Sequence, residues 1–165
     1  FYADVFFDKL LAANHPIDFR GRLELDSPTI SLTDLLLEKL QIVSFTEKDL
    51  KDTLLLLRAH NVAGGHAPET IDEHYIAQLL AKNWGFWYTV TTNLKGLRKT
   101  ISGMPELNET DRGDISSKID KLLQAIEKEP KTTGWKMRSV VGTKKRWYEP
   151  VESSQTIGEF GIWRL

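Results

Sequence analysis

The sequence contains no cysteine among its 165 residues. A disulfide framework, a thiolate metal site and a thiol nucleophile are therefore excluded, and the composition suits a reducing compartment such as the cytoplasm, where we expect this protein. No stretch approaches the ~20 consecutive apolar residues of a membrane-spanning helix, and no charged-then-apolar signal peptide opens the chain. We therefore expect no membrane partner.

Several catalytic motifs are also missing. The sequence has no GxSxG nucleophile turn and no Walker A loop. Its histidines lack the spacing of HxxxH or HExxH, which argues against a zinc site; they stand at positions 15, 60, 66 and 74.

Charge is distributed unevenly along the chain, although the net charge is only −1. Residues 1–82 carry 8 Lys and Arg against 13 Asp and Glu, and residues 83–165 carry 14 against 10. The densest stretch, residues 131–148, has six Lys and Arg and no acid. This asymmetry fits either a surface that binds a polyanion or charge pairing between the two halves.

Hydrophobic periodicity predicts an α+β protein, with a short strand segment at the N-terminus followed by a bundle of five to six helices. We expect strands over 2–9 and 17–26, with a bend at Gly21, and helices from Ser31 to about Val43 and from Thr46 to about His60, each opened by a capping box. Further helices are expected over 70–82, 87–101, 115–126 and 135–148, with loops at 61–69 and 104–109. Residues 1–30 would be the end of a sheet, and residues 31–165 a helical subdomain.

Asp4 is unusual because apolar residues surround it in the first predicted strand. A carboxylate in such a strand is either paired or metal-bound, or it faces water from an edge strand. Spacing alone favours the edge strand. The chain also opens on Phe1 within this strand pattern, so we expect residues upstream of it.

Lys39 falls in the middle of an apolar stripe when the helix after Ser31 is drawn at about 100° per residue. The stripe contains Leu32, Leu35, Leu36, Leu40 and Val43, while Asp34, Glu38 and Gln41 lie on the opposite face. A lysine on an inward face either pairs with a carboxylate or a bound anion, or extends along its stem to water. Asp49 and Asp52 on the next helix are the available partners if the two helices form a hairpin.

The basic stretch near the C-terminus interleaves cations with Trp135, Trp147 and Tyr148. Aromatic rings among cations suit contacts with the bases and phosphates of a nucleic acid, although aromatic residues at helical spacing also occur in cores. The candidate nucleic-acid-binding residues are Lys136, Arg138, Lys144, Lys145 and Arg146.

Three motifs in order carry a family resemblance: ADVFFD at 3–8, PTISLTDLLLEKLQIV at 28–43 and EKDLKD at 47–52. With them the chain resembles nucleotidyltransferase-like proteins of the DNA-polymerase-β superfamily, in particular relatives of the AbiEii-type toxins. Residues 75–101 and 135–149 are similar to the helical extension of uncharacterised members of this group.

The resemblance implies four catalytic residues. Asp4 matches the third metal-binding carboxylate, so it is the expected ligand of Mg²⁺, and Lys39 matches a helical lysine. Asp49 and Asp52 match the two acids of the final motif, often RDxYD, although Lys48 and Lys51 replace its Arg and Tyr. The family's Gly-Ser turn and Asp-x-Asp pair are absent from residues 1–165, so this chain alone is expected to be inactive.

The resemblance therefore implies the C-terminal part of a Mg²⁺-dependent nucleotidyltransferase, which would move a nucleotidyl group from an NTP to an RNA or protein acceptor. An antitoxin-like protein is a further possible partner. The alternative is a non-catalytic helical module that binds RNA or a protein.

Overall fold

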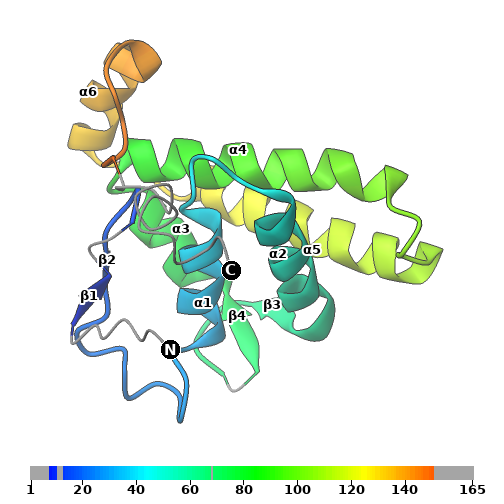
Figure 1. The fold of residues 1–165 in the computed structure, drawn as a ribbon. Coiled ribbons are helices and arrows are strands. Elements are labelled where there is room, and N and C mark those ends of the chain that lie inside the picture. The colour runs from blue at the N-terminus through cyan, green and yellow to red at the C-terminus, as the bar shows by residue number, and fades with distance from the viewer. Residues whose placement is uncertain (1–7, 11–12, 68, 151–165) are drawn as a thin grey trace, which may run out of the picture.

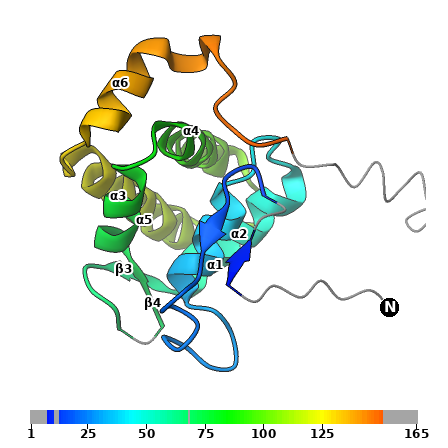
Figure 2. The same cartoon turned by 90° about the vertical axis from the view of Figure 1, so that its left-hand side faces the viewer.

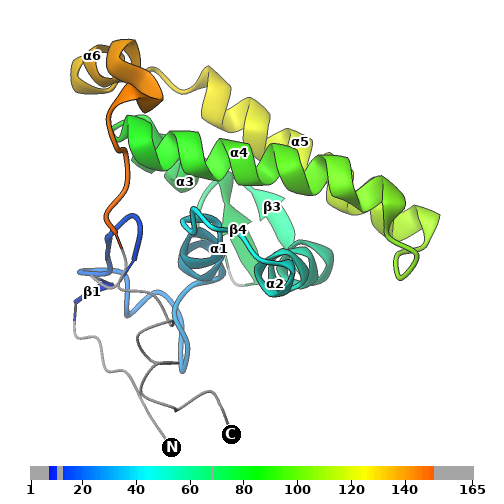
Figure 3. The ribbon, with the colours of Figure 1, turned by 45° about the horizontal axis from the view of Figure 1, so that its top comes forward.

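The computed structural model describes residues 8–10, 13–67 and 69–150. Within these ranges it contains six helices and two sheets of two strands each, which confirms the predicted α+β class with short strands before the first helix. The second sheet was not expected, and it lies between the second and third helices. The long helices α4 (Trp84–Thr100) and α5 (Glu109–Lys128) run side by side (Figures 1 and 3). Helices α1 (Leu32–Leu40), α2 (Glu47–Ala59) and α3 (Glu73–Leu80) pack beneath them.

The core lies where these helices meet. Apolar side chains at helical spacing on each helix are removed from water, which is the main favourable contribution to folding. The largest completely buried side chains are Leu36, Leu37, Leu40, Leu57, Ile71, Ile76, Leu80, Leu94, Leu97, Ile101, Ile115 and Ile119. A 3₁₀ turn, η1 (Ile101–Gly103), joins α4 to the loop before α5.

The two sheets are small. Strands β1 (Lys9–Leu10) and β2 (Ile17–Asp18) pair antiparallel, with Leu10 opposite Ile17. Residues 19–29 form turns instead of continuing the second predicted strand, and Gly21 has a φ of 70° at the predicted bend. Strands β3 (Asn61–Ala63) and β4 (Thr70–Asp72) pair in parallel where we expected a loop and the start of a helix. The side chains of Val62 and Ile71 are buried, so the core recruits this segment as sheet.

Helix capping largely follows the predictions. Ser31 caps α1 by accepting from the amide of Asp34, and Thr46 with Asp49 forms the complete capping box of α2. Helix α3 differs, because Asp72 caps it in place of Thr70 and the helix starts at Glu73.

Helix α6 (Thr133–Val141) stands at one end of the α4–α5 pair, clear of α1 and α2 (Figures 1 and 2). It is shorter than the predicted helix over 135–148. Gly142, with a φ of 58°, ends it and begins the 3₁₀ turn η2 (Gly142–Lys144). None of its residues is buried, so α6 is attached to the bundle through one face only.

Candidate functional site

Lys39 and Asp52 meet between α1 and α2. The Nζ atom of Lys39 lies 3.1 Å from Oδ2 of Asp52, and both side chains are about one-third exposed. Of the two alternatives that the sequence left open for Lys39, the contact shows the first, pairing with a carboxylate of the following helix. The pair lines a hollow of about 370 Å³, together with Leu35, Leu55, Leu56, Ala59 and His60.

The face of α1 differs from the prediction, however. Asp34 and Gln41, expected on the outer face, are buried, whereas Leu32 and Leu35 are only partly buried. Lys39 therefore lies beside the core-facing stripe and not in its middle. The helix is rotated because Asp34 and Gln41 find polar partners inside the fold: Arg22 and Ser31 bind Asp34, and Oε1 of Gln41 accepts from the amide of His15 at 3.1 Å.

The other predicted catalytic residues are placed less favourably for metal chemistry. The carboxylate of Asp49 accepts hydrogen bonds from the amide and hydroxyl of Thr46 and so serves the N-terminus of α2. Asp4 lies outside the described residues. Within residues 8–10, 13–67 and 69–150, no group of three or more His, Cys, Asp or Glu could hold a metal ion. These ranges by themselves do not fit a Mg²⁺ centre.

The basic segment, which we define as residues 131–148, differs from the rest of the chain in its ion pairing. Among the described residues before the segment, ten of fifteen Lys and Arg side chains form ion pairs with Asp or Glu. Within the part of the chain that the structure describes, none of the six cations of the basic segment does so. Its positive charge is therefore left uncompensated.

Two of these six cations are used internally. The Nζ of Lys131 donates to the carbonyl oxygens of Ile126 and Glu129, each at 2.6 Å, at the end of α5. The guanidinium of Arg138 donates to the carbonyl oxygens of Gly142, at 2.6 Å, and of Lys145, at 2.8 Å. It also lies 4.8 Å from the ring centre of Trp84. Arg138 thus holds the turn after α6 against α4.

The remaining four cations point outward. Lys136, Lys144, Lys145 and Arg146 are exposed, and their side chains form no hydrogen bond or ion pair with other described residues. Arg146 has one ring neighbour, Tyr148, at 5.9 Å. These four are the cations of the basic segment that are free to bind an external anion.

The aromatic residues of the basic segment pack against α4. Trp135 meets Trp87 edge to face at 5.0 Å, and Trp147 meets Tyr88 in the same way at 5.1 Å. Trp84 lies between these contacts and stacks on Tyr88 at 5.2 Å. The rings therefore attach α6 to the bundle, and they are not an open platform for bases.

A short strap after η2, residues 145–149, completes this attachment. The amide of Glu149 donates to the carbonyl oxygen of Asn14 at 2.8 Å, and the indole N–H of Trp147 donates to Oγ1 of Thr89 at 3.1 Å. The strap passes so close to α4 that a Cβ at Gly85 would collide with the carbonyl oxygen of Trp147. Glycine is needed here for close approach of two backbones.

His15 lies beneath this strap and was not singled out from the sequence. Its Nε2 is 2.8 Å from Oγ1 of Thr89, its ring stacks on Phe86 at 5.0 Å, and it is 3% exposed. The Thr89 oxygen accepts from Trp147 and also forms the hydrogen bond to Nε2 of His15, so the three side chains are linked. Burial lowers the pKa of His15 to about 4 from 6.5, so the ring is neutral at pH 7.

A second polar group missed by the sequence analysis lies at the start of α1. Arg22 donates to both carboxylate oxygens of Asp34, at 2.8 and 2.9 Å, and its guanidinium lies 3.5 Å from the ring centre of Tyr75. Ser31 donates to Asp34 at 2.7 Å. No local sequence pattern indicated this pairing, because the two residues are twelve positions apart and meet only in the folded chain. The group holds the turns of 19–29 against α1 and α3.

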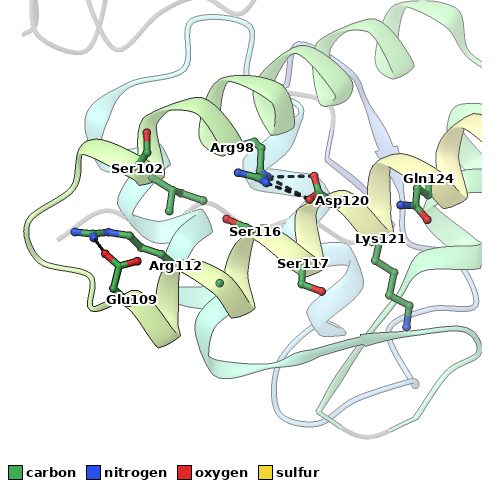
Figure 4. A pocket seen from close by; sticks show the side chains of 11 residues that line it. Arg98, Ser102, Glu109, Arg112, Ser116, Ser117, Asp120, Lys121 and Gln124 are labelled. Atoms are coloured by element: carbon green, nitrogen blue, oxygen red, sulfur yellow. Dashed lines mark hydrogen bonds and ion pairs between the residues drawn. The ribbon is translucent and has the colours of Figure 1, made fainter.

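A groove of about 810 Å³ runs along α5 beside the end of α4. Figure 4 shows Arg98 facing Asp120 across it and Arg112 beside Glu109. The Nε of Arg98 lies 3.1 Å from Asp120. These charges already compensate each other, and no predicted site residue lines the groove, so it suggests no reaction.

Comparison with protein-family models, with curated proteins and with solved structures gives no match for this chain. Among the described residues, no helix is long and apolar enough to cross a membrane. The function is therefore argued from the arrangement of the side chains.

Proposed function

We propose that this chain is a helical module that binds RNA through the basic segment. The observation that carries the proposal is the group of four exposed cations without ion pairs to other described residues, Lys136, Lys144, Lys145 and Arg146, in a segment of eighteen residues, 131–148, with no acidic residue. A folded protein usually surrounds surface cations with acids, as the preceding part of this chain does. An uncompensated cluster attracts a polyanion and releases its counterions on binding.

The aromatic contacts define what kind of RNA recognition this is. Trp135 and Trp147 are half-buried and each packs edge to face against a ring of α4, so they are less available for stacking on bases than the exposed cations are for phosphates. Recognition would therefore depend on phosphate contacts and carry little base specificity. The rigid attachment of α6 by Arg138 and the strap would keep the four cations in fixed positions.

RNA affinity should depend steeply on salt. With four phosphate contacts, the logarithm of the binding constant should fall against the logarithm of salt concentration with a slope of about −3 for single-stranded RNA. Replacing the four exposed cations of the basic segment together by Gln should lower the affinity at least about tenfold and flatten the slope. Fluorescence anisotropy of a labelled RNA oligonucleotide over a salt series measures both.

A matched control exists in the same chain. Lys48, Lys82, Lys95 and Lys99 are also exposed and form no ion pair with other described residues. Their replacement by Gln changes the net charge equally and should leave most of the binding intact. Equal losses in the two quadruple variants would show a bulk charge effect and contradict the proposal. Binding of an acidic polypeptide with no binding of RNA would assign the segment to a protein partner instead.

A second function is compatible with the first, and the contact between Lys39 and Asp52 favours it. The resemblance placed both residues in one nucleotidyltransferase site, and the fold brings them to 3.1 Å. In such an enzyme Asp4, with carboxylates outside residues 1–165, would hold the Mg²⁺ that neutralises the triphosphate. Lys39 would exchange Asp52 for triphosphate oxygens as a point charge, and the basic segment would hold an RNA acceptor.

Lys39→Met separates a structural from a functional role of this lysine. The pair is about one-third exposed, so the free energy of unfolding should fall by no more than about 1 kcal/mol. NTP binding, measured by calorimetry, should be lost if Lys39 contacts the triphosphate. Lys51→Met is the control, because Lys51 pairs with Glu47 on the exposed side of α2 and should change neither quantity. If Lys39→Met binds NTP as the wild type does, Lys39 does not contact the triphosphate and is not a residue of the nucleotide site.

A further inference from the structure

The outer face of α2 carries an exposed apolar side chain at its centre. Leu55 is 61% exposed, which is unusual for a leucine in the middle of a helix whose opposite face is completely buried at Leu57. The residues one turn away on the same face are Lys51, Asp52, Arg58 and Ala59. Leu55 is thus a single apolar projection surrounded by opposite charges and one small residue.

Leu55 stands between two hollows. One, of about 270 Å³, is lined mainly by Leu54, Leu55, Met104 and Leu107. The other is the hollow of about 370 Å³ beside Lys39 and Asp52, where Leu35, Leu56 and Ala59 supply apolar walls. An apolar projection next to apolar hollows on one surface is the arrangement that a twofold contact needs, because each copy offers both the side chain and the hollow that receives it.

The charges on this face are complementary to themselves. If two α2 helices cross antiparallel at Leu55, the residue three positions before it lies opposite the residue three positions after it in the other copy. Asp52 then meets Arg58 of the second copy, twice, once on each side of the axis. Four positions from Leu55, Lys51 of one copy lies opposite Ala59 of the other, whose small side chain leaves room for the lysine stem. Like charges do not face each other in this register.

We propose that this face of α2 is a homodimer surface, with the twofold axis at Leu55 and Asp52–Arg58 pairs on either side. Both side chains are accessible, Arg58 at 50% and Asp52 at 33% exposed, and each also has a partner within its own copy: Asp52 lies 3.1 Å from Lys39 and Arg58 lies 2.8 Å from Asp111. The pairs across the axis would extend these internal ion pairs into a charge network. A helix of 13 residues is about 20 Å long, so the contact is smaller than a standard interface and the dimer should be weak and depend on concentration.

Sedimentation equilibrium of the whole chain over micromolar concentrations tests the proposal. The expected result is a monomer–dimer equilibrium, with a dissociation constant raised at least about tenfold by Leu55→Glu. Leu55 is exposed, so this change should leave the fold intact, which circular dichroism checks. Val140→Glu is the matched control, since Val140 is 84% exposed on α6 and should have no effect. A monomer at all concentrations, or a dimer that Val140→Glu dissociates and Leu55→Glu does not, overturns the proposal.

A charge exchange between copies tests the register. Arg58→Asp alone places two acids opposite each other, and Asp52→Arg alone places two arginines opposite each other, so neither variant should dimerise by itself. Mixed together, they should form a heterodimer with about the wild-type dissociation constant, because each Asp again faces an Arg. Two variants that stay monomeric when mixed, while both remain folded, would overturn this arrangement.

Discussion

Asp34→Ala is expected to lower the free energy of unfolding by about 3–5 kcal/mol, because it leaves the Arg22 guanidinium without its partner in a site that water hardly reaches. The carboxylate of Asp34 is 1% exposed and the side chain of Arg22 15%. The change also removes the acceptor of the Ser31 hydroxyl at the N-terminus of α1. Urea unfolding of the variant measures the loss.

Two further variants show whether the buried charge is the cause. Asp18→Ala removes an exposed carboxylate that pairs with Arg20 and should leave stability nearly unchanged. The double variant Arg22→Met/Asp34→Leu removes both charges and should be more stable than Asp34→Ala alone, since no unpaired charge remains. A double variant as unstable as the single one would mean that shape, and not charge, makes Asp34 important.

Stability should also decline as the pH falls below about 6.5, and His15 is the reason. In the unfolded chain His15 binds a proton below 6.5, whereas in the folded chain burial lowers its pKa to about 4. Between these values the unfolded state binds more protons, so its population grows as the pH falls. The contribution of the neutral His15 to the free energy of unfolding is fully present above pH 6.5 and is lost as the pH approaches 4. Its total is about 3 kcal/mol. Urea unfolding from pH 7.5 to 4.5 follows it.

His15→Gln is the control for this pH dependence. The variant loses the stacking on Phe86 and is less stable throughout, but it has no imidazole to titrate, so its stability should change much less between pH 7 and 5. Above pH 5 the carboxylates contribute little change, because their ordinary pKa values lie near 4. The same slope in the variant and the wild type would show that another group is responsible.

The starts of several helices were predictable because caps are local. Ser31 and Thr46 each act on an amide three residues ahead, so their signals lie within one turn of sequence. The contact between Lys39 and Asp52 was one of the alternatives that the sequence left open, because a short connection between two amphipathic helices favours a hairpin that brings Asp49 or Asp52 near Lys39. The parallel pair of strands over 61–63 and 70–72 was not predictable from the sequence. Strand pairing is favourable there only because the core buries Val62 and Ile71.

For the candidate site too, some features follow from the sequence and others only from the fold. The position of the cations at 136–146 and the absence of nearby acids follow from the sequence. The sequence does not show which of these cations are free to bind a ligand. Arg138 is not free, because it donates to the carbonyl oxygens of Gly142 and Lys145 and lies over the ring of Trp84, more than fifty residues away in the chain. The same holds for Trp135 and Trp147, because only the folded structure packs their rings against Trp87 and Tyr88 of α4.

The sequence by itself determined the class of the protein, the approximate positions of its helices, the N-caps Ser31 and Thr46 and the place of its excess positive charge, since all of these depend on composition and on neighbours within a turn or two. Tertiary structure decided which polar groups are buried. Asp34 points inward because Arg22 and Ser31 compensate its charge there, and His15 is neutral because Phe86, Thr89 and the strap remove it from water. Burial of a charged or polar side chain depends on partners that the chain brings together only on folding, and no local pattern encodes them.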